Sequence, residues 1–170
     1  PECPGSVFSA LGLVADGMKK LILDIRDNTG GYFNQALLLS NLFLSKGDNI
    51  VNLDGLHRSR EEYNADGRGI LQDIGLVVVI NENSASSSEI FAGAIQDNDR
   101  GVIVGRRSYG KGLVQEPLYF SDGSAVRISV ARYYTPSGRC IQRPYSAGED
   151  YRMDLYKRYI DGEMFSQDSV

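Results

Sequence analysis

Histidine, cysteine and tryptophan are nearly absent from this 170-residue chain, which has one histidine, two cysteines and no tryptophan. The single histidine, His57, lies in the polar, glycine-punctuated stretch 57–69, where we expect an exposed loop or hairpin and a solvated side chain. A Ser-His-Asp triad is therefore not expected. Because no cluster of His, Cys and Asp has the spacing of metal ligands, we expect neither a metal nor a cofactor.

Long apolar runs and an excess of positive charge are also missing. The formal net charge is −4 and the pI about 5.0, which argues against a nucleic-acid-binding surface. No apolar run approaches the roughly 20 residues that a membrane span needs. The chain begins at Pro1, with neither an initiator methionine nor a signal peptide. We therefore expect one domain cut from a longer protein whose targeting signals lie outside it.

The two cysteines, Cys3 and Cys140, have no metal-site spacing. They could pair or stay free, and the sequence does not decide between these states.

The apolar fraction of 42% is large enough for a full core. Helical and strand patterns alternate along the chain, which is typical of an α/β fold. Expected strands lie at 21–25, 49–56, 76–80, 102–104, 113–120 and 125–134, and expected helices at 11–18, 34–46, from 86 onward and at 151–159. The first strand is apolar almost throughout, as buried parallel strands are. Gly47 is a natural C-cap for the helix 34–46, and Val126, Ile128 and Val130 should share one face of the last strand.

The stretch from Leu76 to Gln115 organises the rest of the chain. An apolar strand leads through a polar turn to a serine cluster, Ser84-Ala85-Ser86-Ser87-Ser88, and then to a helical pattern. A second strand follows, and then Lys111 between two glycines. This order predicts a serine at a helix N-terminus with a lysine brought back beside it.

Ser86 and Lys111 are the residues on which catalysis would depend. A serine hydroxyl is a weak nucleophile unless a nearby base takes its proton. Lys111 can be that base if burial, which disfavours the ammonium form, lowers its pKa. The helix N-terminus and the amides of the Gly30-Gly31 turn could hold the oxyanion of a tetrahedral intermediate.

Purely structural readings of the same residues remain open. Ser84, Ser86 or Ser88 could be a helix N-cap, with Glu89 completing a capping box. Lys111 could be a surface lysine in a turn, and Gly30-Gly31 a tight strand-to-helix connection.

Four motifs, in order, resemble the catalytic domain of the carboxyl-terminal processing (tail-specific) proteases, peptidase family S41. They are Leu21-Ile22-Leu23-Asp24-Ile25-Arg26-Asp27-Asn28-Thr29-Gly30-Gly31, Asn83-Ser84-Ala85-Ser86-Ser87-Ser88-Glu89-Ile90-Phe91-Ala92-Gly93-Ala94, Ser108-Tyr109-Gly110-Lys111-Gly112-Leu113-Val114-Gln115, and Tyr133-Tyr134-Thr135-Pro136-Ser137-Gly138-Arg139-Cys140-Ile141-Gln142. The resemblance covers roughly residues 17–145.

The resemblance implies a role for several residues. Ser86 would be the nucleophile of a Ser-Lys dyad and Lys111 its general base. Gln115 would orient the lysine amine, and Asp97 matches an acidic position that some members need. The oxyanion hole is implied at the Ser87 amide and at the turn formed by Gly30 and Gly31.

The resemblance further implies the spiral ββα core shared with ClpP and the crotonases. Residues 1–170 would be the catalytic domain, with 146–170 a C-terminal helical extension and with the PDZ domain of the parent protein outside the chain. The substrates would be C-terminal tails of exported proteins with apolar end residues. Members are usually exported, so a periplasmic or cell-envelope location is implied.

Three other assignments compete with a protease. Gly105 to Gly112 nearly fits the phosphate-binding P-loop pattern, but Gly112 replaces the required hydroxyl residue and a strand, not a helix, is expected to follow. A crotonase-like acyl-CoA enzyme would share the fold but would not use Ser86 and Lys111. A catalytically silent relative would bind peptides or scaffold a complex.

Overall fold

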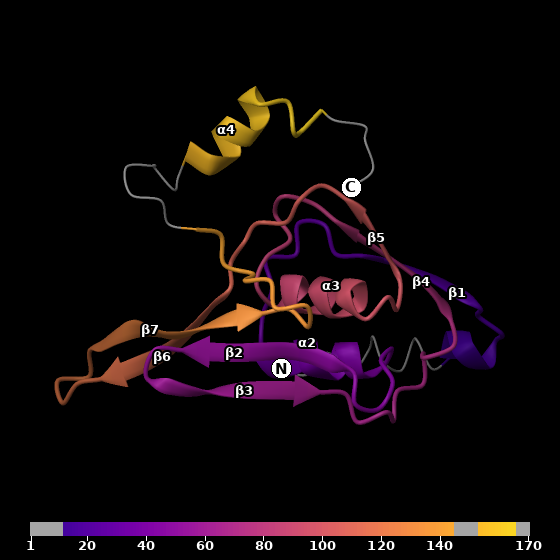
Figure 1. Cartoon of the computed structure of the whole chain (residues 1–170), viewed down its shortest axis with the longest axis horizontal. Helices are drawn as coiled ribbons and strands as arrows, with labels where there is room; N and C mark the ends of the chain where they lie inside the picture. Colours follow the sequence, from indigo (N-terminus) through magenta and orange to yellow (C-terminus); the bar gives the residue numbers. More distant parts are fainter. Residues whose placement is uncertain (1–11, 145–152, 166–170) are drawn as a thin grey trace.

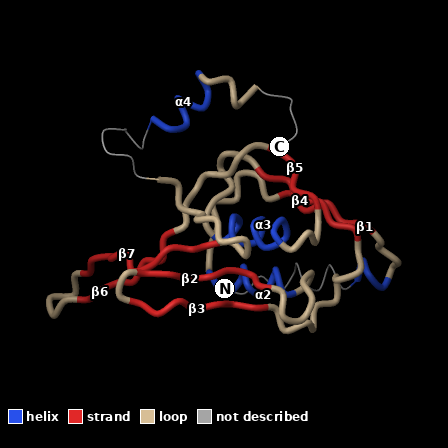
Figure 2. The backbone as a smooth tube through the Cα atoms, in the orientation of Figure 1, coloured by secondary structure: helices blue, strands red, loops and turns tan. Residues whose placement is uncertain are grey.

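The computed structural model describes residues 12–144 and 153–165, and these residues form two β-sheets and the three helices α2, α3 and α4 (Figures 1 and 2). The three-stranded parallel sheet has the order β1 (Lys20–Asp24), β4 (Gly75–Ile80), β5 (Val102–Gly105). The four-stranded antiparallel sheet has the order β3 (Arg58–Asn64), β2 (Asn49–Gly55), β7 (Ala125–Tyr134), β6 (Leu113–Tyr119). The helices are α2 (Phe33–Asn41), α3 (Ser87–Asp97) and α4 (Asp154–Ile160), and residues 12–15 also form a helical turn.

Helix α3 lies between the two sheets and forms the centre of the core (Figure 1). It packs against α2, β2 and β5, and every residue from Ser88 to Ile95 is buried. Phe91 of α3 meets Phe43, with ring centroids 5.8 Å apart. Because α3 begins directly after the serine cluster, burying this helix also fixes the position of that cluster.

The expected strands and the helix after Ser86 are confirmed within one or two residues, and the stretch 57–69 forms a hairpin arm, β3. The helix expected at 151–159 is present as α4, with residues 145–152 outside the described part. No helix among the described residues is long and apolar enough to cross a bilayer.

Helix α2 ends earlier than expected. Its last residue is Asn41 and its C-cap is Leu42, so the assignment of Gly47 as C-cap was wrong. The Leu42 carbonyl accepts a hydrogen bond from Leu71 N (2.9 Å) and is unavailable to a further helical turn. Phe43 and Leu44 leave the helix and are buried in the core.

Strand β1 pairs in parallel with β4, as expected, but it is not buried on both faces. Burial alternates along it, and Ile22 is 70% exposed. Helix α3 packs against β5 of this sheet, and Ile22 is on the opposite side of β1 from the half-buried Leu21 and Leu23. In the β6–β7 hairpin, Val126 and Ile128 are likewise exposed, and a register shift at Val130 interrupts the alternation expected there.

One half-buried guanidinium, that of Arg100, connects the loops around the core. Arg100 donates hydrogen bonds to the carbonyls of Phe43 (2.7 Å), Leu71 (2.6 Å) and Ile74 (2.8 Å). These carbonyls belong to the segments that follow α2 and precede β4. The Arg100 guanidinium therefore donates hydrogen bonds to loop carbonyls that have no partner in a helix or strand.

We expect Arg100→Met to lower the free energy of unfolding by about 3 kcal/mol, because three carbonyls lose a charged donor while the apolar stem is kept. Urea unfolding measures the change. Arg60→Met is the matched control: its ion pair with Glu62 (3.4 Å) is exposed and should contribute less than about 1 kcal/mol. Equal losses in the two variants would contradict this account.

Candidate active site

Ser86 occupies a strained position between strand and helix. It is the N-cap of α3, with φ 58° and ψ −118°. Positive φ is unusual for a residue with a side chain, and such a conformation costs about 1–3 kcal/mol. The surrounding contacts must hold Ser86 in this conformation. A serine on a sharp strand-to-helix turn is also the arrangement that exposes a nucleophile in many hydrolases.

Hydrogen bonds join the turn before Ser86 to the turn after β1. Ser84 Oγ donates to the Ile25 carbonyl (2.8 Å), and Asp27 N donates to Asn81 Oδ1 (2.9 Å). The Asn28 carbonyl accepts from Ala85 N (3.0 Å) and from Ser88 Oγ (3.1 Å). The glycine turn and the serine cluster therefore form one unit, although about 55 residues separate them in sequence.

Gly30 lies directly against Ser86. A Cβ atom added to Gly30 would be 2.7 Å from Ser86 Cβ and 2.9 Å from Ser87 N, and the φ of Gly30 is +92°. Only glycine fits this position, for both reasons. The structure thus brings the Gly30-Gly31 turn to the start of α3, as the sequence predicted.

The N–H groups around Ser86 differ in availability. Gly30 N donates to Asn28 Oδ1 (2.9 Å) and is occupied. Neither Gly31 N nor Ser87 N donates to another residue in the described part of the chain. Ser87 is the first residue of α3, where helix N–H groups point away from the helix without partners.

The carboxylate of Glu89 connects the serine segment to the lysine segment. Glu89 Oε2 accepts from the backbone N–H of Ser86 (2.8 Å) and of Lys111 (2.8 Å). Glu89 Oε1 accepts from Gly110 N (2.6 Å). Since Ser86 N and Lys111 N bond to one oxygen atom, they lie at most two hydrogen-bond lengths apart. Glu89 is 5% exposed, so these contacts form away from bulk water.

The sequence identified Glu89 only as part of a capping box. Its bond to Ser86 N is that capping contact. The bonds to Gly110 and Lys111 join residues more than 20 positions apart and have no local sequence signature. A glutamate on the otherwise apolar, buried face of a helix was the available signal, because a buried carboxylate needs donors.

Lys111 is exposed, which corrects one expectation. Burial was the condition under which Lys111 was expected to act as a base. The flanking glycines do let the chain fold tightly, since Gly110 has φ +86° and touches Arg143, and Gly112 packs on Ile141 and Gln142. This packing fixes the backbone and leaves the amine in solvent. The strand β6 begins at Leu113, so the P-loop alternative fails for lack of a following helix.

Gln115 lies on β6, and its side-chain amide contacts Ser129 Oγ across the hairpin at 3.5 Å. The side chain is exposed. Its expected role toward the Lys111 amine stays a prediction.

Asp97, at the C-terminal end of α3, anchors the turn 135–138. Its carboxylate accepts from Ser137 Oγ (2.6 Å) and Ser137 N (3.1 Å) and pairs with Arg139. Burial alone would raise the pKa of Asp97, but hydrogen bonds from Ser137, Thr135 and Arg139 outweigh it and hold the pKa below its usual value. Asp97 therefore supports the turn after β7 through these contacts.

Neither His57 nor Cys140 contacts Ser86 or Lys111 through a hydrogen bond or disulfide within the described part of the chain. His57 is exposed in the β2–β3 turn. Cys140 is exposed and forms no disulfide with a described residue, and Cys3 lies outside the described residues.

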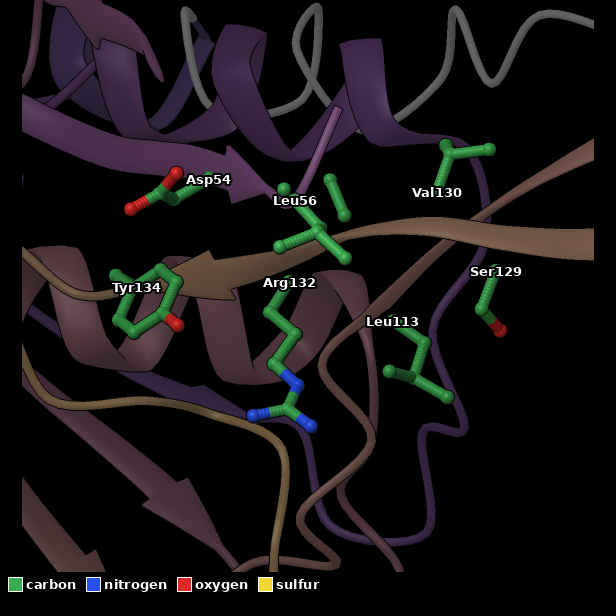
Figure 3. A pocket seen from close by; sticks show the side chains of 9 residues that line it. Asp54, Leu56, Leu113, Ser129, Val130, Arg132 and Tyr134 are labelled. Carbon is green, nitrogen blue, oxygen red and sulfur yellow. The ribbon is translucent and has the colours of Figure 1, made fainter. Parts of the chain in front are cut away.

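A pocket of about 680 Å³ lies beside the segment that carries Lys111. It is formed by the end of β2 with the turn that follows, the start of β6 and the C-terminal half of β7 (Figure 3). Leu113, two residues after Lys111, lines it together with Leu56, Tyr134 and Arg132. In Figure 3 Arg132 and Leu113 extend to the same side of β7. The lining is thus mixed: Leu56, Leu113 and Val130 are apolar, whereas Asp54 and Arg132 carry opposite charges.

Comparison with known proteins identifies the family of the chain. The model of "Peptidase family S41" matches residues 5–149. A chloroplastic C-terminal processing peptidase of Tetradesmus obliquus is 43% identical over 131 residues, which are 77% of this chain and 28% of that protein. A "Probable CtpA-like serine protease" of Staphylococcus aureus (strain bovine RF122 / ET3-1) is 35% identical over 127 residues, which are 74% of this chain and 26% of that protein.

A solved structure is also similar. The photosystem II D1 C-terminal processing protease superimposes with a TM-score of 0.75 at 40% identity, covering 79% of this chain and 35% of that one. The chain thus spans about a quarter to a third of the length of these relatives.

We expect Glu89→Gln to lower the free energy of unfolding by about 1–3 kcal/mol. The amide has one acceptor oxygen in place of two, so at least one backbone N–H among Ser86, Gly110 and Lys111 loses its partner. Urea unfolding measures the loss. Glu62→Gln, on an exposed strand position, is the control and should change little. An unchanged stability in Glu89→Gln would show that the three bonds contribute nothing.

Asp97 should make stability depend on pH in the acid range. Its pKa is lowered by folding, so its contribution is present above the unfolded value and is lost as pH falls below about 4. In Asp97→Asn, the stability deficit relative to the unchanged chain should therefore shrink as pH falls from 7 to 3. Thermal unfolding across this range tests it, with exposed Asp16→Asn as control. A deficit independent of pH would contradict the assignment.

Proposed function

The chain belongs to peptidase family S41, and on that premise we propose that it is the catalytic part of a serine endopeptidase that cuts C-terminal protein tails. Ser86 is the nucleophile and Lys111 the general base. The observation that supports this best is the single Glu89 oxygen that binds the backbone of both residues. A helix cap alone would need only the Ser86 contact.

The proposed reaction is acyl transfer to serine. Ser86 Oγ attacks the carbonyl carbon of the scissile peptide bond while the neutral Lys111 amine accepts its proton. The tetrahedral intermediate collapses by breaking the C–N bond, and the lysine ammonium returns the proton to the leaving amine. Water, deprotonated by the same lysine, then hydrolyses the acyl ester and restores Ser86 Oγ–H.

The N–H groups of Gly31 and Ser87 are the proposed donors to the oxyanion. Both are free of other partners in the described structure, whereas Gly30 N is bound to Asn28. Gly30 contributes by its missing side chain, which lets the turn approach Ser86. Fixed backbone donors of this kind are worth about 10²–10³ in kcat each.

Exposed Lys111 needs a drier environment for this chemistry. We infer that the bound substrate peptide, lying across the dyad, removes the Lys111 amine from water and so favours its neutral form. Gln115 is proposed to orient the amine once the peptide is bound. Asp97 is proposed to act indirectly: it does not contact the substrate but fixes the turn 135–138 at the end of α3.

The pocket beside Leu113 is proposed to receive an apolar side chain of the tail. Relatives named as C-terminal processing peptidases support a tail as substrate. A PDZ domain elsewhere in the parent protein would capture the tail, and a periplasmic or cell-envelope location would bring it to exported proteins. The finer fold assignment, a ClpP- and crotonase-like spiral core, is part of the same proposal.

The alternative is a catalytically silent, peptide-binding relative. The exposure of Lys111 favours it, because a solvated lysine is a poor base. The two functions differ in one observable: a silent relative binds tail peptides and leaves them intact.

Ser86→Ala and Lys111→Ala should each abolish cleavage of a peptide with an apolar C-terminus, because each removes one residue of the dyad. Both variants should keep the fold, because neither side chain packs in the core. Lys111→Arg should also be inactive, since a guanidinium stays protonated. Mass spectrometry of the products measures cleavage. Ser59→Ala and Lys19→Ala, both exposed, are the controls. Cleavage by a folded Ser86→Ala or Lys111→Ala variant would refute the dyad.

A further inference from the structure

Helix α4 lies beyond residues 5–149, the part of the chain that the family model matches. It lies outside the two sheets, at the top of Figure 1. Its contacts are made with the segment 106–111, which connects β5 to the base Lys111. The helix is therefore an addition to the matched catalytic core that reaches the base segment.

Arg158 makes the central contact. It is 3% exposed, the most buried charged side chain of the described part of the chain. Its Nη2 donates to the Arg107 carbonyl (2.6 Å) and its Nη1 to the Ser108 carbonyl (3.4 Å). Its Nε donates to Glu163 Oε1 (2.9 Å). An exposed arginine would make a short surface helix soluble without these contacts. Burying the charge of Arg158 is unfavourable unless acceptors such as these carbonyls and Glu163 bind it.

Two further ion pairs attach α4 and the residues after it to the same region. Glu163 pairs with the Arg107 side chain (2.9 Å), so Arg107 is held through both its carbonyl and its guanidinium. Asp154 pairs with Arg143 (2.5 Å), whose guanidinium lies 4.5 Å from the Tyr109 ring centroid. Arg107 to Tyr109 are thus contacted from the α4 side at each residue.

The same segment is held from the opposite side by the nucleophile region. Tyr109 N donates to the Ser84 carbonyl (3.0 Å), and Gly110 N and Lys111 N donate to Glu89. The base segment is therefore clamped between α3 and α4. Tyr109 is bound by the turn before α3, Gly110 and Lys111 are bound by Glu89 of α3, and the contacts from Arg158 lie on Arg107 and Ser108.

We propose that Arg158 is a positioning residue for the general base: it fixes Arg107 and Ser108 so that the segment delivers Lys111 to Ser86. This inference rests on the proposed function for its effect on catalysis, but not for its effect on the segment itself. A shift of about 1 Å in a catalytic group can lower the rate by about 100-fold. Loss of Arg158 should therefore reduce kcat and leave KM nearly unchanged, since Arg158 touches no proposed substrate contact.

The test compares the chain with Arg158→Ala, Arg158→Lys and the control Tyr156→Ala, which removes an exposed side chain from the same helix. Amide hydrogen exchange is measured at Tyr109, Gly110 and Lys111 and within α3. In Arg158→Ala, exchange at these three amides should rise at least about 10-fold while α3 stays protected. Arg158→Lys, which keeps one donor group, should restore part of the protection, and Tyr156→Ala should match the unchanged chain.

Cleavage kinetics form the second readout. We expect kcat of Arg158→Ala to fall at least about 10-fold at unchanged KM, with partial rescue by Arg158→Lys. Unchanged exchange at the three amides in Arg158→Ala would overturn the proposal, as would exchange that rises equally throughout α3. If Arg158→Ala does not fold, Glu163→Gln, which weakens the same contact, is measured in its place under the same criteria. If the unchanged chain cleaves no peptide, the proposed function fails, and hydrogen exchange alone still decides whether Arg158 fixes the segment.

Discussion

A single buried carboxylate constrains the arrangement of the whole site. Glu89 accepts hydrogen bonds from the backbone of Ser86, Gly110 and Lys111. These contacts join the start of α3 to the connection between β5 and β6. Because they involve main-chain atoms, they fix the positions from which the Ser86 and Lys111 side chains extend, whatever rotamers these adopt. Helix α3 in turn is buried and packs against α2, β2 and β5, so the core determines where the carboxylate lies.

The other features of the site follow from the conformation this constraint requires. Ser86 is held at positive φ, which a serine would not adopt unaided. The Gly30 turn fits against it only because Gly30 has no side chain. These close approaches leave two backbone N–H groups, of Gly31 and Ser87, without described partners beside the serine. Strain, glycine and free donors at one point are features of a preorganised catalytic site.

Much of this arrangement was predictable from the sequence, and what was missed has a common cause. The strands and the start of the helix after Ser86 follow from local periodicity and were confirmed within about two residues. The convergence of Gly30 and Ser86 was also confirmed. The early end of α2 depends on Leu71, 29 positions after Leu42, which takes the carbonyl that the helix would need. The exposure of Ile22 and Lys111 and the additional bonds of Glu89 likewise depend on residues distant in sequence. Periodicity and capping rules describe neighbours along the chain and carry no information on such pairs.

The base segment 106–111 is the least regular part of the site and is also the most extensively contacted, by α3 on one side and α4 on the other. Its backbone is fixed, and the Lys111 amine remains in solvent. The backbone of the site is therefore in place while the Lys111 side chain is still solvated. Under the proposed mechanism, the bound substrate removes this water from Lys111. The most direct test is to let the chain react with an activated peptide ester and to stop the reaction with acid. Mass spectrometry then locates the acyl group on the chain. The account predicts an ester on Ser86, formed in the unchanged chain and not in Lys111→Ala. An acyl group on any other residue, or its equal formation without Lys111, would contradict it.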